Sequence, residues 1–152
     1  MNHKPDAVHA MTLEEQHAEI RELIEQLKRR SSRLSDQDEP KAVGSETLAI
    51  LQKLEALLDD HFALEEKGKY LASALAIAPR LSETAARLLK QHGELLDQLR
   101  GIIQRITEAG PSSPAGSTLE KQIDRFADHL RNHDTAENQL VQAAYFDDHG
   151  GG

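Results

Sequence analysis

Four long stretches of this sequence repeat apolar residues every three or four positions, which is the period of an α-helix with one buried face. No stretch alternates apolar and polar residues as a half-buried strand does. Amphipathic helices joined by connections of moderate size pack side by side in alternating directions. We therefore predict an all-α fold, an antiparallel up-down-up-down four-helix bundle. The helices are expected at about residues 12–31, 45–68, 82–108 and 117–145.

Local capping signals support these boundaries. TLEE (12–15) and STLE (117–120) both place a hydroxyl residue three positions before a glutamate, the order in which each side chain binds a free backbone amide of the other residue. Ser45 and Ser82 are each followed by a glutamate and are expected to cap the other two helices. The breaks between helices are expected at 31–45, 68–80 and 110–117.

Length and charge limit the kind of protein. The chain has 152 residues, 38% of them hydrophobic, which suits one domain with a real core. We expect a single domain over residues 1–152 with flexible termini. The net charge is −8, and no dense cluster of Lys and Arg offers a face for phosphates, so nucleic acid is not an expected partner.

The chain contains no cysteine, which excludes disulfides, thiolate metal ligands and cysteine nucleophiles. Its amino end lacks the order of a signal peptide, and no apolar run approaches the ~20 residues of a membrane span. We therefore expect a cytoplasmic protein without membrane contact. The sequence leaves the oligomeric state open.

Polar residues interrupt all four apolar stripes. The first and third helices place one histidine in the stripe, and the second and fourth place a histidine followed four residues later by a glutamate. In an antiparallel bundle with a rise of ~1.5 Å per residue, all of these side chains fall at one end, in a layer on the order of 10 Å thick. The six residues are His17, His61, Glu65, His92, His133 and Glu137.

This layer has the composition of a metal site. Two carboxylates in one dry core repel each other and lose hydration, so they are either protonated or face a cation. Imidazole and carboxylate donors without thiolates suit iron, manganese, zinc or cobalt. Six ligands are too many for one tetrahedral zinc and too few to saturate two octahedral ions. Two metals fit better, with Glu65 and Glu137 as bridges, solvent-derived bridges, and at least one open coordination position.

The stretches QHAEIREL (16–23), HFALEE (61–66), QHGELLDQL (91–99) and HLRNHDTAENQLV (129–141) resemble the four ligand-bearing helices of hemerythrin-like proteins, the HHE cation-binding domains. The resemblance covers nearly the whole chain in order and spacing. It implies a four-helix bundle with a non-haem di-iron centre: two iron ions (Fe²⁺/Fe³⁺) with an oxo or hydroxo bridge. The ligands that it implies are His17, His61, Glu65, His92, His133 and Glu137.

The resemblance has departures that bear on function. Oxygen-carrying hemerythrins have a second histidine on the third helix and an aspartate on the fourth, where this chain has Leu96 and Glu137. The set of four His and two Glu is more similar to iron-sensing domains and iron–sulfur repair proteins of the same superfamily, which argues against a simple oxygen carrier. Repair proteins also have a cysteine-bearing amino-terminal segment, which this chain lacks.

Several neighbouring residues have two interpretations. Glu66 and Asp134 either orient an imidazole or face solvent, and Phe62 and Phe126 either exclude water from the site or simply pack in the core. His129, on the flank of its stripe, is predicted to be a surface or supporting residue and not a ligand. Histidines expected at the surface of the chain ends are His3, His9 and His149.

The connection KYLASALAIAP (69–79) is more apolar than a connector needs to be. Because it lies at the metal end of the predicted bundle, it either folds over the mouth as a lid or lengthens the second helix. Gly93, on the outward side of the third helix, has no evident role and costs about 1 kcal/mol relative to alanine.

The leading functional hypothesis is a binding or sensing protein, whose di-iron centre takes up O2 or NO or responds to iron. The alternatives are a di-iron enzyme acting on peroxide or NO, and iron storage or donation. No acid, base or substrate pocket is evident beyond the ligands, which favours a metal- and gas-binding protein over a dedicated enzyme.

Overall fold

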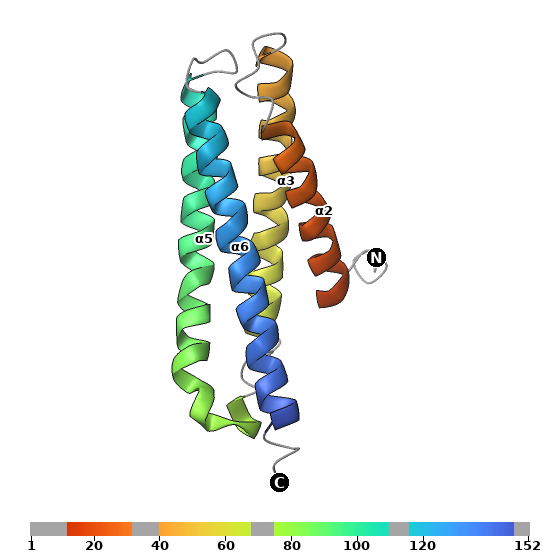
Figure 1. Cartoon of the computed structure of the whole chain (residues 1–152), viewed down its shortest axis with the longest axis vertical. Helices are drawn as coiled ribbons and strands as arrows, with labels where there is room; N and C mark the ends of the chain where they lie inside the picture. The colour runs from red at the N-terminus through yellow and green to blue at the C-terminus, as the bar shows by residue number, and fades with distance from the viewer. Residues whose placement is uncertain (1–11, 32–39, 68–74, 110–115, 148–152) are drawn as a thin grey trace, which may run out of the picture.

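The four predicted helices form an antiparallel bundle. The computed structural model describes residues 12–31, 40–67, 75–109 and 116–147. Its long helices α2, α3, α5 and α6 run alternately up and down (Figure 1), and the described ranges contain no strand. The predicted all-α fold is thereby confirmed. The elements are α2 (Leu13–Ser31), α3 (Pro40–Lys67), the 3₁₀ turn η1 (Pro79–Leu81), α5 (Ser82–Ala109), α6 (Gly116–Gln142) and the π-helical turn η2 (Ala143–Asp147).

The start of α2 follows the predicted capping box. The Thr12 amide donates to Glu15 Oε1 (2.9 Å), and the Glu15 amide donates to Thr12 Oγ1 (3.1 Å). Each side chain therefore satisfies an amide that the helix leaves without a partner.

The predicted caps at Ser45 and Ser82 are wrong. Helix α3 begins at Pro40 and passes through Ser45, because a proline is favoured in the first turn, where its missing N–H is not needed. Ser82 already has helical dihedrals (φ −62°, ψ −35°). Winding begins earlier, at the η1 turn, where the Leu81 amide donates to the Ala78 carbonyl (3.0 Å).

The other predicted boundaries agree to within a few residues. Helix α6 begins at Gly116 and continues as η2 to Asp147; the side chain of Ser117, its predicted cap, lies outside the described part of the chain. So do the predicted flexible ends, with His3, His9 and His149, and residues 32–39, 68–74 and 110–115 of the predicted connections.

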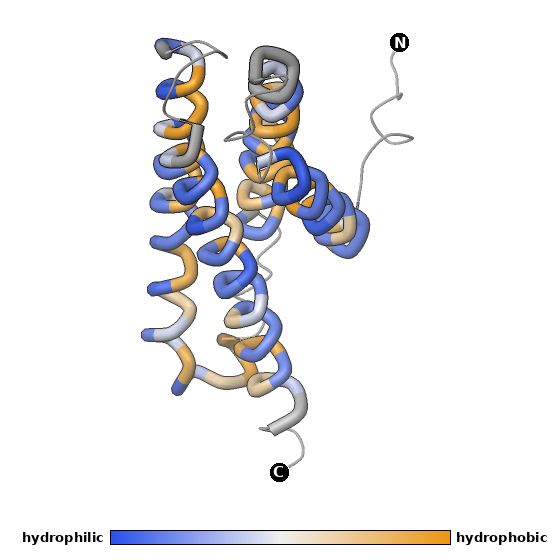
Figure 2. Tube along the Cα trace, turned by 45° about the horizontal axis from the view of Figure 1, so that its top comes forward, coloured by the Kyte–Doolittle hydropathy of each residue, from blue (hydrophilic) through white to orange (hydrophobic). Residues whose placement is uncertain are grey.

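The bundle has two apolar cores with the polar layer between them. Figure 2 shows hydrophobic and hydrophilic residues alternating along the helices, as the stripes require. The larger core is built by all four long helices and includes Leu27, Leu54, Leu99 and Phe126. The smaller core lies one turn beyond the layer, at Leu88 of α5 and Leu140 of α6, and includes Ala78, Ala85 and Ala144. The layer is thus sealed by packing above and below.

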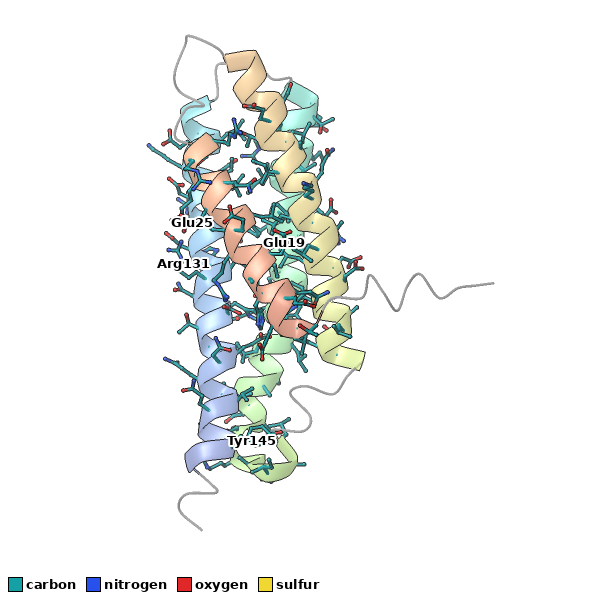
Figure 3. All side chains as sticks on the ribbon, turned by 90° about the vertical axis from the view of Figure 1, so that its right-hand side faces the viewer. Glu19, Glu25, Arg131 and Tyr145 are labelled. Atoms are coloured by element: carbon teal, nitrogen blue, oxygen red, sulfur yellow. The ribbon has the colours of Figure 1, made fainter. Side chains whose placement is uncertain are left out.

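Helix α2 is shorter than the other three and crosses α3 and α6 obliquely (Figure 3). Its oblique path matters for the site because α2 forms one wall of a pocket described below. No described helix is both long and apolar enough to span a membrane.

Candidate metal centre

The polar layer is organised around two buried carboxylates. His61 Nε2 and His92 Nε2 each lie 3.2 Å from Glu65, and His17 Nε2 lies 3.9 Å from it. His92 Nε2 also lies 3.2 Å from Glu137 Oε2, and His133 Nε2 lies 3.1 Å from the same oxygen. All four imidazoles therefore turn the same ring nitrogen inward, and the structure brings the six predicted residues together.

The i, i+4 spacing that the sequence repeats has a direct geometric role. In both α3 and α6 the histidine and the glutamate lie one turn apart on the same face, so each Nε2 meets the carboxylate of its own helix. The carboxylates then meet the histidines of the neighbouring helices, which supply one ring each.

Glu65 and Glu137 each face more than one histidine. The Oε2 atom of Glu65 faces His61 and His17, whereas its Oε1 atom faces His92. Among the described residues, two sets of donor atoms, each within 4.8 Å of one another, could hold a cation, and both include Glu137. The first set consists of His17, His61, Glu65 and Glu137, and the second of His92, His133 and Glu137.

The electrostatics of the layer fit a cation. Both carboxylates are 1% exposed, and within the described structure the two oxygens of Glu65 and the Nε2 atom of His17 have no hydrogen-bond partner. A buried carboxylate without hydrogen bonds is costly unless a positive charge compensates it. Imidazole nitrogens and carboxylate oxygens are donors that iron, manganese, zinc and cobalt accept. The residues present therefore fit the implied metals.

The two carboxylates favour a positive charge on the imidazole of His92, which lies between them. Burial lowers the pKa of His92, but the close carboxylates of Glu137, Glu65 and Glu66 outweigh burial and raise it to about 10. Burial raises the pKa of Glu137, but hydrogen bonds from His133 and His92 outweigh burial, so the pKa falls well below the usual value. The layer thus binds positive charge between its carboxylates.

Three of the histidines are held by their outer nitrogen. His61 Nδ1 donates to Gln16 Oε1 (2.9 Å), His92 Nδ1 to Glu66 Oε2 (2.8 Å) and His133 Nδ1 to Gln91 Oε1 (2.7 Å). The acceptors Gln16, Glu66 and Gln91 therefore support the inward orientation of Nε2.

Sequence reasoning anticipated only one of these acceptors. For Glu66, orientation of an imidazole is one of the two roles that the sequence suggests. The sequence does not point to Gln16 or Gln91 in this way. A signal was present, because a glutamine directly precedes the histidine in both single-histidine helices, as Gln16-His17 and Gln91-His92. Each glutamine contacts a histidine of a different helix, and the sequence alone does not show which helices are neighbours.

His17 differs from the other three histidines. Its side chain is 15% exposed, and the Oδ1 atom of Asp134 lies 3.3 Å from Nε2, the inward nitrogen. Asp134 therefore does not hold His17 in the manner of the other contacts. This corner of the layer is its most accessible part.

The two predicted phenylalanines have different positions. Phe62 stacks on His92, with ring centroids 4.0 Å apart and an interplanar angle of 5°, and its edge also meets His133. It walls the layer and shields it from water. Phe126 is fully buried in the larger apolar core, so the core-packing interpretation holds for Phe126.

A pocket of about 250 Å³ reaches the layer from the side, between α2, α3 and α6. It touches His17, His61, His133 and Glu137. Its apolar lining is buried and includes Ile20, Ile24, Leu58 and Leu130. Charged residues edge it, among them Glu25 of α2 and Arg131 of α6, which Figure 3 labels beside the seam between these helices. An apolar passage behind a charged rim suits small uncharged molecules.

His129 lies outside the layer. Its ring is exposed, and Nδ1 bonds Gln98 Oε1 of α5 at 3.1 Å. It belongs to neither donor set, and that His129 is not a ligand stays a prediction.

A four-helix bundle that encloses a layer of imidazole and carboxylate donors defines a helical cation-binding protein. The family model described as the Hemerythrin HHE cation binding domain matches residues 9–145. The chain belongs to this hemerythrin family, and family membership implies that it binds metal cations. Searches found no match among curated proteins or among solved structures.

Proposed function

We propose that this protein holds two iron ions side by side in the histidine–glutamate layer and uses them to bind or sense O2 or NO, or to respond to iron. The observation that carries the proposal is the position of Glu65, whose two oxygens face different histidines on opposite sides, together with the sharing of Glu137 by both donor sets. A single ion would leave one side of this arrangement without a partner.

The residues that would hold the ions divide into two pairs of histidines. His17 and His61 would hold one ion and His92 and His133 the other, and Glu65 and Glu137 would be shared between the two. Bound iron supplies a redox change between Fe²⁺ and Fe³⁺ and an affinity for diatomic molecules. The protein supplies a fixed set of donors and a sheath of apolar side chains that excludes water.

The pocket between α2, α3 and α6, called the α2–α6 pocket from here on, supports a role in binding small molecules. It reaches the corner of the layer at His17, and the buried apolar part of its lining, Ile20, Ile24, Leu58 and Leu130, offers no charge to a ligand before it meets the layer. Molecules such as O2, NO or peroxide fit a passage of this size. Turnover of peroxide or NO is the second candidate function, because the same passage would admit these molecules to a redox-active centre. Iron storage or donation is the third, and it requires that the ions leave easily.

The test begins with the purified protein loaded with Fe²⁺ under anaerobic conditions and analysed for bound metal. We expect about two ions per chain for the wild type and for His129→Ala, a histidine variant outside the layer. We expect far less for Glu65→Ala. A wild-type protein that binds well under two ions per chain after this treatment would contradict a dinuclear centre.

The loaded protein is then given O2, NO and peroxide separately while its optical spectrum is recorded. A reversible spectral change supports binding or sensing, and sustained consumption of peroxide or NO supports the enzymatic candidate. Rapid loss of iron to a chelator, with no response to any of the three, supports storage or donation.

A further inference from the structure

The contacts to the outer histidine nitrogens follow a regular order around the bundle. Gln16 of α2 holds His61 of α3, Glu66 of α3 holds His92 of α5, and Gln91 of α5 holds His133 of α6. Each acceptor is the sequence neighbour of a layer residue on its own helix, namely His17, Glu65 and His92. Each of these helices thus supplies a donor to the layer and a support to the next helix.

The geometry of a helix explains the pattern. Consecutive residues are about 100° apart around the axis, so the neighbour of an inward-facing residue lies toward the seam with an adjacent helix. From that seam a glutamine or glutamate reaches the outer edge of the ring on the next helix. The last contact differs, because Asp134 of α6 approaches the inward Nε2 atom of His17 at 3.3 Å.

We propose that Gln16, Glu66 and Gln91 are positioning residues that fix the hydrogen on Nδ1 of His61, His92 and His133, so that each Nε2 lone pair is available to a cation. An ionised carboxylate only accepts hydrogen bonds, and the glutamine oxygens that face the rings also accept. The ring nitrogen opposite them must therefore carry the hydrogen. The inference rests on the proposed metal-binding function and names the residues that prepare the site.

The choice between glutamine and glutamate follows burial. Gln16 is buried and Gln91 is half-buried, whereas Glu66 is exposed. A third buried carboxylate would add negative charge beside Glu65 and Glu137, so a neutral amide is the less costly acceptor inside the bundle. Glu66 has solvent to carry its charge, and the charge makes His92 a stronger electron donor than its neighbours.

Gln91 offers the sharpest test, because α5 contains a matched control. Gln98 lies two turns further along α5 and contacts a histidine of α6, His129, across the same seam. We would compare Gln91→Met, which keeps the length but removes the acceptor, with Gln91→Glu, which keeps the acceptor and adds charge. Gln98→Met is the control, and circular dichroism verifies the fold of each variant.

The first measurement needs no metal. Nitrogen-15 NMR of the metal-free protein should show a hydrogen-bonded Nδ1–H signal for His133 in the wild type and in Gln98→Met. The signal should be lost in Gln91→Met. A wild type without this signal, or a Gln91→Met variant that keeps it, would overturn the positioning role.

The second measurement is the affinity for Co²⁺, followed by its optical bands in competition with a chelator. Gln91→Met should bind about 10–100-fold more weakly than the wild type, Gln98→Met should be unchanged, and Gln91→Glu should recover most of the loss. With iron, Gln91→Glu should also have a lower reduction potential than the wild type, which a purely structural role of residue 91 would not produce.

The outcomes separate the two proposals. If the wild type binds neither cobalt nor iron, the proposed function fails, while the NMR measurement still decides whether Gln91 holds His133. If the wild type binds cobalt and Gln91→Met binds it equally well, the proposed metal site stands and the positioning role is refuted.

Discussion

At the scale of single residues, His92 is the group on which most contacts of the layer converge. It lies between Glu65 and Glu137, its outer nitrogen donates to Glu66, and Phe62 covers its face. A cation that binds at Nε2 must displace the proton there. Metal affinity should therefore rise with pH, because ligand imidazoles bind metals only when that nitrogen is deprotonated.

The raised pKa of His92 also predicts a pH dependence of stability without metal. A group whose pKa is higher in the folded state stabilises the fold fully below its unfolded pKa, here near 6.5, and this stabilisation disappears as the pH approaches about 10. The lowered pKa of Glu137 acts at the other end, since its contribution is lost as the pH falls below about 4.5.

Comparison with His92→Asn isolates the histidine contribution. In the presence of a chelator, the wild type should exceed the variant in free energy of unfolding most strongly near pH 6, and the difference should shrink steadily from pH 6.5 to 10. Urea unfolding at a series of pH values measures it. A difference that grows with pH would contradict the assignment.

Gly93 is a position where a substitution is expected to raise the stability of the protein. It lies exposed within α5, next to His92, and a Cβ atom built on it meets no atom within 4 Å. Packing therefore does not require a glycine here. Gly93→Ala should stabilise the protein by roughly 0.5–1 kcal/mol through the backbone entropy of the unfolded chain, measured by thermal unfolding. Metal content should not change; a destabilised variant would mean that α5 needs its flexibility.

At the scale of elements, the oblique path of α2 leaves room for the α2–α6 pocket, which reaches the polar layer. Ile24→Phe places a larger side chain in this pocket of about 250 Å³. We expect slower reaction of the reduced, iron-loaded protein with O2 and NO at unchanged iron content, because the passage narrows while the donors stay in place. Stopped-flow absorbance would measure the rates, and an unchanged rate would exclude this pocket as the route.

A second possible route for small molecules to the layer passes the smaller core at the end of the bundle. Leu75 is partly buried and packs against this core, which also contains Ala78; both belong to the apolar segment that sequence analysis assigned either to a lid or to a longer helix. Helix α3 is described only to Lys67, and residues 68–74 lie outside the described ranges.

Leu75→Ala should cost about 1–2 kcal/mol of stability, less than a fully buried leucine. If the segment is a lid, the variant should also quicken oxidation of the reduced centre. An unchanged oxidation rate, together with a slowed Ile24→Phe variant, would assign access to the α2–α6 pocket and remove the lid hypothesis.

At the scale of the whole molecule, all four helices contribute to the polar layer, which lies between the larger apolar core and the smaller core of α5, α6 and their flanking residues. A metal that binds there ties the helices together and stabilises only the folded chain. With free metal at 100 times its dissociation constant, the gain is about 2.7 kcal/mol. The wild type should therefore melt at a higher temperature with Fe²⁺ or Zn²⁺ than with a chelator.

His61→Ala and Glu137→Ala should lose both the bound metal and this rise in melting temperature, while His129→Ala should keep both. Differential scanning calorimetry with and without metal measures the effect. A rise that survives in His61→Ala would mean that the stabilising metal binds elsewhere.

Much of the fold and of the layer was accessible from the sequence because the signals involved are local and periodic. The stripe that includes Leu95 and Leu99 predicts a helix from its own spacing, and the His61–Glu65 and His133–Glu137 pairs depend only on the pitch of one helix. The start of α3 was not accessible in this way, because the Ser45-Glu46 capping signal competes with Pro40 and both are compatible with a helix start.

The sequence by itself determined which residues face inward and at what height, since the 3.6-residue period and the antiparallel order follow from the chain alone. Only the tertiary structure decided which helix neighbours which, and hence that Gln16, Glu66 and Gln91 hold histidines on other helices. It also decided that α2 tilts to leave a pocket beside His17. Those contacts arise from packing between segments far apart in the chain, and no local pattern of residues encodes them.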